Sequence, residues 1–305
     1  LGMLRHEAGV VATVVAVAPH AARASDPAAE PSATTHFPDP ATGYARFRWY
    51  GEVSQFSIKI LGTEAVRAGV QVGYVAHDEE FGSIVPINIV GTTVGFFHTI
   101  YPINNQALSL LGVHEGLRAV FTDSDYNERD YVTRIIMTYD RPDYTLHHLR
   151  ISPDKPNERK RIVIPREMYD DLSMVFDLRS RDLRIGDTYV YYNHDGEIFD
   201  RFAVTVTGTE SVYTPMGHID AYVIQWIGES LESHPVLPFG DVALPPTFRT
   251  TTEPTEIARS YISTDERRLL VGADIPTSIG NMTIRLADYT GPNTAYVAPA
   301  RETLP

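Results

Sequence analysis

Hydrophobic and polar residues alternate with a period of two along most of the chain, which is typical of antiparallel strands. The alternation is clearest over residues 188–225. The Asp-Gly pair at residues 195–196 is a strong hairpin signal, and Phe202, Val204 and Val206 share one face of the strand that follows it. This stretch therefore predicts a β-meander.

Shorter alternating or β-branched runs predict the rest of a β-rich domain. The segment at residues 105–113 is apolar without a clear period, so a helix and a strand both stay open for it. The other predicted strands are residues 45–53, 55–61, 71–75, 117–122, 131–139, 145–151, 161–164, 261–263, 269–273 and 282–286.

One helix is predicted over residues 166–183. Met168, Leu172, Val175 and Phe176 recur there at spacings of three and four, which predicts an apolar stripe packed against a sheet. No internal repeat and no clean linker interrupts the strand pattern. We therefore expect a mostly β fold, a single large antiparallel domain with one main packed helix.

The N-terminal residues are typical of a secretory signal peptide over residues 1–24. Arg5 precedes an apolar run at residues 9–18, and residues 22–24 (Ala-Arg-Ala) match a small-x-small cleavage pattern. The run is short for a membrane span, which needs about 20 residues. A buried helix start and an uncleaved anchor are the alternatives.

The rest of the chain divides into three further parts. Residues 25–42 are rich in proline and alanine and predict an extended tether, residues 43–290 form the β-rich domain, and residues 291–305 are a C-terminal tail. Residues 229–256 are a proline-rich insertion, a loop long enough to suggest a function. The apolar residues that we expect to bind a partner in this insertion are Phe239, Leu244 and Phe248.

Charge and cysteine content exclude several classes of function. The chain has 26 basic and 39 acidic side chains and a net charge of -13, which argues against nucleic-acid binding and against broad adhesion to anionic lipid surfaces. It has no cysteine, which excludes disulfides, thiolate metal sites, cysteine nucleophiles and lipid attachment through cysteine. Stability must therefore come from a large core.

Candidate catalytic and metal-binding motifs are weak. Residues 123–130 begin like a calcium loop, but Glu128 replaces the glycine at position six and Arg134 the glutamate at position twelve, so a polar turn is favoured. His147 and His148 are adjacent and would point to opposite faces of a strand. The other histidines lie in separate segments, two of which could still converge in space. We predict no catalytic residue, no cofactor and no bound metal.

Three further groups of residues have a structural and a functional interpretation. Asp170 and Asp171 stand near the predicted helix start, where carboxylates interact favourably with the helix dipole. We favour this structural interpretation over paired acid–base catalysis. Aromatic residues at 96, 97 and 101 could line a groove, and core packing is favoured. The clustered basic residues could bind an anion, but salt-bridged or solvated positions are favoured for them. These residues are Arg159, Lys160, Arg161, Arg179, Arg181, Arg184, Arg267 and Arg268.

The order of several motifs resembles the exported bacterial family called domain of unknown function 3108. The resemblance covers about residues 44–288. It rests on Phe47-Arg-Trp-Tyr-Gly51, Ile60-Leu-Gly-Thr-Glu64, Tyr101-Pro102, Asp171-Leu-Ser-Met-Val-Phe176, Leu183-Arg-Ile-Gly-Asp187, the meander from Val204 to Gly217, and Ser263-Thr-Asp265-Glu-Arg-Arg268. The resemblance implies an envelope-associated protein with a curved or open barrel-like sheet, and it carries over no catalytic residue. The proline-rich insertion departs from the family pattern.

We therefore expect a non-catalytic protein of the periplasm or cell envelope that binds an apolar ligand, such as a lipid, or a protein partner, and that is peripheral to the membrane at most. Dense aromatic strands and the export signal motivate this hypothesis. An accessory subunit docked on a larger membrane assembly, such as an energy-transducing or transport complex, is the first alternative. An exported hydrolase built from acids or histidines that converge in the fold is the second.

Overall fold

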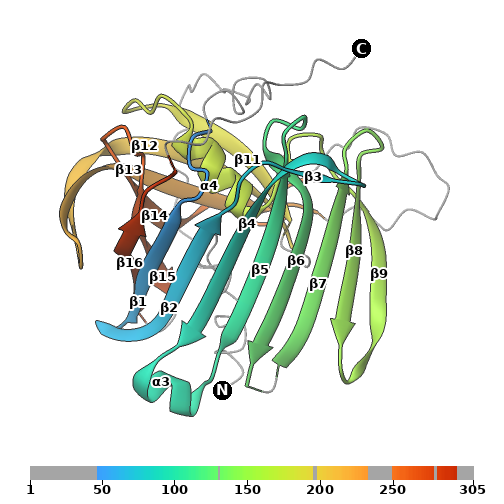
Figure 1. The fold of residues 1–305 in the computed structure, drawn as a ribbon, viewed down its shortest axis with the longest axis horizontal. Coiled ribbons are helices and arrows are strands. Elements are labelled where there is room, and N and C mark those ends of the chain that lie inside the picture. Colours follow the sequence, from blue (N-terminus) through green and yellow to red (C-terminus); the bar gives the residue numbers. More distant parts are fainter. Residues whose placement is uncertain (1–46, 130, 195–197, 233–248, 278–279, 294–305) are drawn as a thin grey trace.

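A computed structural model of the chain describes residues 47–129, 131–194, 198–232, 249–277 and 280–293. This described part contains sixteen strands in one sheet and two helices, and the sheet bends round on itself (Figure 1). The predicted mostly β fold with a curved, barrel-like sheet is confirmed. Neither described helix is long and apolar enough to cross a membrane.

The strands follow the chain as a meander, and all neighbours pair antiparallel except the short parallel pair β10–β11. Their order across the sheet is β10-β11-β12-β13-β14-β15-β16-β1-β2-β4-β5-β6-β7-β8-β9, with β3 paired to β4. The strands are β1 Val53–Ile60, β2 Thr63–Val72, β3 Ala76–Asp78, β4 Gly82–Thr93, β5 Asn104–Gly112, β6 Arg118–Glu128, β7 Tyr131–Asp140, β8 Thr145–Ser152, β9 Lys155–Val163, β10 Met168–Tyr169, β11 Thr188–His194, β12 Phe199–Thr214, β13 Gly217–Ser230, β14 Thr255–Ser263, β15 Leu270–Thr277 and β16 Gly280–Thr290.

Two features of this strand order give the sheet the form of an open barrel. The last strand, β16, pairs with the first, β1, so the two ends of the described chain meet in the middle of the sheet. The two edge strands, β9 and β10, are consecutive in sequence. Gly272 in β15 has φ +155°, and a Cβ there would lie 2.1 Å from the carbonyl oxygen of Ile284, so β15 and β16 pack this closely only because residue 272 is glycine.

Helix α4 (Asp171–Arg179) lies inside the curve of the sheet (Figure 1). Leu172 and Phe176 join the larger core cluster, whereas Met174 and Leu178 join a second cluster with the aromatic residues of β11 to β13. The predicted helix at residues 166–183 is therefore real but shorter. The expected single apolar stripe was wrong, because a helix enclosed by a sheet buries apolar side chains on all sides.

Several local predictions differ from the structure. Residues 105–113 mostly form strand β5, which settles the helix-or-strand question. The predicted strand at residues 45–53 was wrong for its described part, because Phe47 to Trp49 are irregular and Tyr50-Gly51 is a turn; these aromatic side chains pack into the core. The polar turn predicted from Asp123 was also wrong, because β6 continues to Glu128. Strand β4 was missed because its proline and glycine read as strand breakers.

The proline-rich insertion is shorter than predicted, because β13 extends to Ser230 and β14 begins at Thr255. Phe239, Leu244 and Phe248, the predicted partner-binding residues, lie outside the described residues. The second helix, α3 (Gly95–Ile100), connects β4 to β5 at the end of the sheet away from α4 (Figure 1).

Candidate functional site

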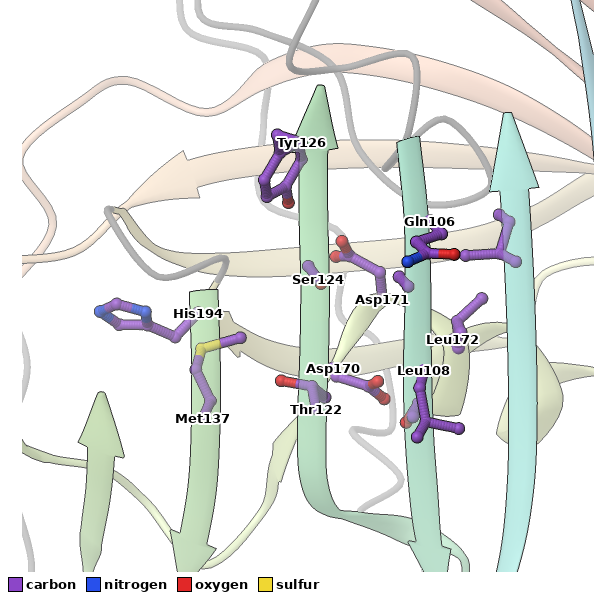
Figure 2. Close-up of a pocket in the computed structure, with 13 residues that line it drawn as sticks. Gln106, Leu108, Thr122, Ser124, Tyr126, Met137, Asp170, Asp171, Leu172 and His194 are labelled. Carbon is purple, nitrogen blue, oxygen red and sulfur yellow. The ribbon is translucent and has the colours of Figure 1, made fainter. Parts of the chain in front are cut away.

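A small cavity with a mixed polar and apolar lining lies between the sheet and the start of α4 (Figure 2). Its volume is about 50 Å³. Strands β4 to β7, the first residues of α4 and the end of β11 supply its lining, which consists of Ile89, Gln106, Ala107, Leu108, Ser109, Thr122, Ser124, Tyr126, Met137, Asp170, Asp171, Leu172 and His194. The cavity thus joins two acids and a histidine from separate parts of the chain.

Asp170 is the N-cap of α4. Its carboxylate accepts the Ser173 backbone N–H at 2.8 Å, and the Ser173 hydroxyl lies 3.0 Å from the Asp170 backbone nitrogen, which completes a capping box. Burial raises the pKa of Asp170, while the nearby hydroxyls of Ser109 and Ser173 act in the opposite direction. The interpretation of this acid pair as a helix start is confirmed for Asp170.

Asp171 connects the start of α4 to the end of β11. Its Oδ1 accepts a hydrogen bond of 2.5 Å from the side-chain amide of Asn193, which is only 2% exposed. The cavity geometry around the acid therefore depends on the β11 end as well as on the helix.

His194 enters the cavity wall from β11 in its neutral form. Burial, followed by the charges of His148 and Lys160, lowers the pKa of His194 to about 3. His148 is buried and His147 exposed, so the prediction that they face opposite sides of β8 is confirmed. The fold thus brings together two histidines, His148 and His194, that sequence spacing could not pair.

The cavity is suited to water. A cavity needs a volume of roughly 10–15 Å³ to hold one water molecule, whereas pockets for drug-sized ligands measure about 300–1,000 Å³. Ser109 and Thr122 face the cavity, and neither hydroxyl has a hydrogen bond of good geometry within the described part of the chain, although Ser109 is near enough to affect Asp170. We infer that water completes the bonding of these groups.

The cavity favours a structural role over hydrolysis. A general base works best with a pKa near the working pH, and the pKa of His194 is far below neutral. Asp170 is held by its capping bonds. The hydrolase hypothesis predicts convergent acids and histidines, and the fold does bring Asp170, Asp171 and His194 together, but the low pKa of His194 does not suit this residue as a general base at neutral pH.

In the calcium-like segment, the two acids at positions 123 and 125 lie against an arginine. Asp123 lies in β6, where it accepts a hydrogen bond of 2.8 Å from the Nε of Arg134 in β7, and Asp125 lies 3.9 Å from the same guanidinium. The arginine therefore occupies the place of a cation. Among the residues with described positions, no group of three acids or histidines could hold a metal.

The other end of α4 carries a buried ion pair. Arg179 donates two hydrogen bonds to Glu52, of 2.8 and 2.7 Å, and both side chains are at most 3% exposed. The guanidinium also lies 4.5 Å from the ring centroid of Trp49 and donates through Nε to the backbone of Arg268. This clamp joins the start of the described chain, the helix and the segment before β15.

Two further arginines of the predicted basic group form ion pairs. Arg181 pairs with Asp177, and Arg267 pairs with Asp265, so salt-bridged positions are confirmed for both. Residues 159–161 lie on β9, an edge strand of the sheet. Charged residues on an edge strand oppose pairing with another chain.

Three apolar side chains are exposed at the α3 end of the sheet. Phe96 of α3 is 71% exposed, Ile100 46%, and Leu61 in the turn between β1 and β2 is 70% exposed. The two segments are neighbours, because the backbone N–H of Val94 bonds to the carbonyl of Ala65 in β2. We call Leu61, Phe96 and Ile100 the apolar rim. The expectation of core packing holds for Phe97 and Tyr101, which pack against the core, but is wrong for Phe96.

The family model described as "Protein of unknown function (DUF3108)" matches residues 54–287. The chain belongs to this family. Membership confirms the resemblance that the sequence motifs indicated. No curated protein matches the chain.

The solved structures to which this DUF3108 member is partly similar are distant from it in sequence. The beta-barrel-like protein of domain of unknown function DUF1849 from Brucella abortus is 8% identical, with a TM-score of 0.48 and coverage of 81% of this chain and 100% of that chain. A protein with a YmcC-like fold from Bacteroides fragilis NCTC 9343 is 9% identical, with a TM-score of 0.30 and coverage of 80% and 99%.

Sequence reasoning missed Glu52 and Leu61. Glu52 has no sequence signal, since its partner lies 127 residues away. Leu61 had one: a two-residue Leu-Gly link between strands places an apolar residue where hairpins prefer Asn or Asp.

Proposed function

We propose that this DUF3108 member is a non-catalytic protein of the cell envelope that acts by binding, and that the apolar rim is its binding surface. The observation that carries the proposal is the joint exposure of Leu61, Phe96 and Ile100 at one end of the sheet. Phe96 and Ile100 are four residues apart on α3 and so lie on one face of that helix, and exposed apolar side chains that lie together mark interaction sites more often than scattered ones do.

The energetics of the rim support a binding role. Full burial of a leucine, isoleucine or phenylalanine side chain is worth about 1.5–3 kcal/mol relative to exposure. The rim side chains are exposed in the isolated protein and lack much of this burial free energy. A partner that covers them would supply it. Phe97 and Tyr101, on the same connection, pack against the core and hold the segment in place.

The N-terminal sequence supports the location. The basic residue, the apolar run at residues 9–18 and the Ala-Arg-Ala site fit a secretory signal, so the partner would be met in the periplasm or at a membrane surface. The cavity beside α4 is too small to hold a lipid chain, which supports the rim as the apolar contact.

Site-specific photo-crosslinking tests this function. A photoreactive residue in place of Phe96, in the full chain expressed in its native envelope, should give one dominant adduct, with a protein or a lipid identified by mass spectrometry. Ile185, 64% exposed in the turn between α4 and β11, is the matched control position and should give none. Equal adduct yields at both positions, or no adduct at residue 96, would contradict the proposal.

A further inference from the structure

The side of β6 to β8 that faces away from the core carries apolar side chains. Ile136 of β7 lies between the core residues Ile135 and Met137, so its side chain points to the outside of the sheet. Leu149 of β8 is its register partner and shares that face. An antiparallel sheet that packs one face on a core usually places polar residues on the other face, so these two positions depart from the expected pattern.

Two more apolar side chains extend this face. Phe121 pairs with Thr138 and Ile151 with Arg134, and both partners lie two residues from Ile136 in β7, on the same side of the sheet. All four apolar side chains are half-buried, and none of them belongs to a core cluster of the described chain. Strands β6 to β9 lie side by side at one edge of the sheet (Figure 1). We call this set the outer apolar face: Phe121, Ile136, Leu149 and Ile151.

Charges of opposite sign stand at the two sides of this face. The pairing register places Asp123 of β6 beside Ile136, Ile136 beside Leu149, and Leu149 beside Arg159 of β9, so the four form one row across the strands. Asp123 is paired with Arg134 of its own chain. Arg159 is exposed and forms no ion pair with another described residue. The row therefore reads acid, apolar, apolar, base.

This order is complementary to itself. A two-fold axis parallel to the strands, between β7 and β8, places β6 of one copy over β9 of the other and β7 over β8. Ile136 then faces the partner's Leu149, and Asp123 faces the partner's Arg159. An axis across the strands would place like charges opposite each other, which is unfavourable. Sheets packed face to face lie about 10 Å apart with strands within about 30° of each other, a gap that these side chains span.

We propose that the outer apolar face packs against the same face of a second copy of this chain, as a symmetric dimer. Four strands at about 4.8 Å spacing span about 19 Å, and seven residues along a strand span about 23 Å, which gives a projected contact of about 440 Å². A standard stable interface covers about 800 Å² on each partner, so the dimer forms only at high concentration. The proposal is independent of the binding function of the apolar rim, because it rests on other residues.

Sedimentation equilibrium of the full chain over a concentration series tests the dimer. The parent protein should shift from the monomer mass to the dimer mass as concentration rises. Leu149→Thr should raise the dissociation constant about a hundredfold, because loss of one buried apolar side chain costs about tenfold and the change occurs twice in the dimer. Val90→Thr is the matched control. Val90 is 50% exposed in β4, beyond the overlap of β6 to β9, so its dissociation constant should equal that of the parent.

An exchange of charges tests the symmetry of the contact. Arg159→Glu brings a carboxylate against the partner's Asp123, and Asp123→Lys brings an ammonium against the partner's Arg159. Each variant alone should stay monomeric at concentrations at which the parent dimerises. An equimolar mixture of the two variants should recover the dimer, because both charged contacts then join opposite charges. A role of either residue in folding alone would not produce recovery on mixing.

Three results would overturn the inference: a parent protein that stays monomeric at every concentration, a dissociation constant unchanged by Leu149→Thr, or folded charge variants that fail to recover the dimer on mixing. If Asp123→Lys does not fold, the comparison of Leu149→Thr with Val90→Thr still decides the outcome. A monomer that binds phosphatidylcholine vesicles, and loses this binding in Leu149→Thr, would replace the second copy by a lipid surface and reject the dimer.

Discussion

The two ends of α4 bury polar groups in different ways. At the C-terminal end, Arg179 and Glu52 satisfy each other through two hydrogen bonds, and Arg179 also has a backbone and an aromatic partner. At the N-terminal end, Asp170 caps the helix beside a cavity into which the Ser109 and Thr122 hydroxyls project. A closed polar cluster fixes the fold, whereas an open one tolerates exchange with water.

The largest expected effect lies at the closed end. Arg179→Met should reduce the free energy of unfolding by about 3–5 kcal/mol, because it leaves the Glu52 carboxylate buried without its partner. Urea unfolding of the two proteins would measure the loss. Arg67→Met removes a surface ion pair with Glu64 and is the matched control, for which we expect a loss below about 1 kcal/mol.

A double variant sharpens this prediction. Glu52→Gln combined with Arg179→Met removes the isolated charge and should recover part of the stability lost by Arg179→Met alone. If Arg179→Met and Arg67→Met cost the same, the ion pair is not the clamp that the geometry indicates.

A smaller effect is expected at the open end. Asp170→Ala should cost about 1–2 kcal/mol through loss of the N-cap of α4, whereas Asp170→Asn should cost less because asparagine is also a good N-cap. Thermal or urea unfolding would rank the variants. An equal loss for alanine and asparagine would show that charge, and not capping, is the contribution of Asp170.

The pH dependence of stability provides a further test. Burial raises the pKa of Asp170 above its unfolded value, so its contribution to stability is fully present below about pH 4 and is lost as pH rises through the folded pKa. The free energy of unfolding should therefore fall with rising pH in this window more steeply for the parent than for Asp170→Asn. Parallel curves would mean that Asp170 does not titrate as its burial implies.

The smallest effect is expected for the cavity hydroxyls. Thr122→Val removes a hydroxyl that faces the cavity, and we expect a change below about 1 kcal/mol because this hydroxyl has no protein hydrogen bond of good geometry to lose. Urea unfolding would again serve as the measurement. A loss of stability as large as that of Asp170→Ala would mean that the polar groups at the N-terminal end of α4 are as fully paired as those at the C-terminal end.

Local patterns predicted the parts of this protein that depend on local geometry. Alternation identified β7, β8 and β11 to β13 because each of these strands has one buried face, and the spacing of Leu172 and Phe176 identified α4. The helix was predicted to begin at residue 166, five residues too early, and the acid pair was placed near its start; Asp170 is its N-cap. Strand β4 escaped prediction because Pro86 weakens the local signal, whereas pairing with β2 and β5 forms the strand.

Long-range contacts decided the candidate sites. Glu52 and Arg179 are 127 residues apart, and His194 meets the start of α4 only because the sheet curves back over the helix. The sequence does not distinguish Phe96 from Phe97, yet one is 71% exposed and the other packs against the core.

Local sequence patterns were enough to predict the β-rich class and the approximate position of the central helix, because backbone periodicity and capping act within a few residues, and the order of the motifs indicated the family. Only the tertiary structure decided which charges are buried, which hydroxyls face water and which aromatic side chains remain exposed. Burial is a property of everything that covers a residue, and in this protein the covering elements come from distant parts of the chain.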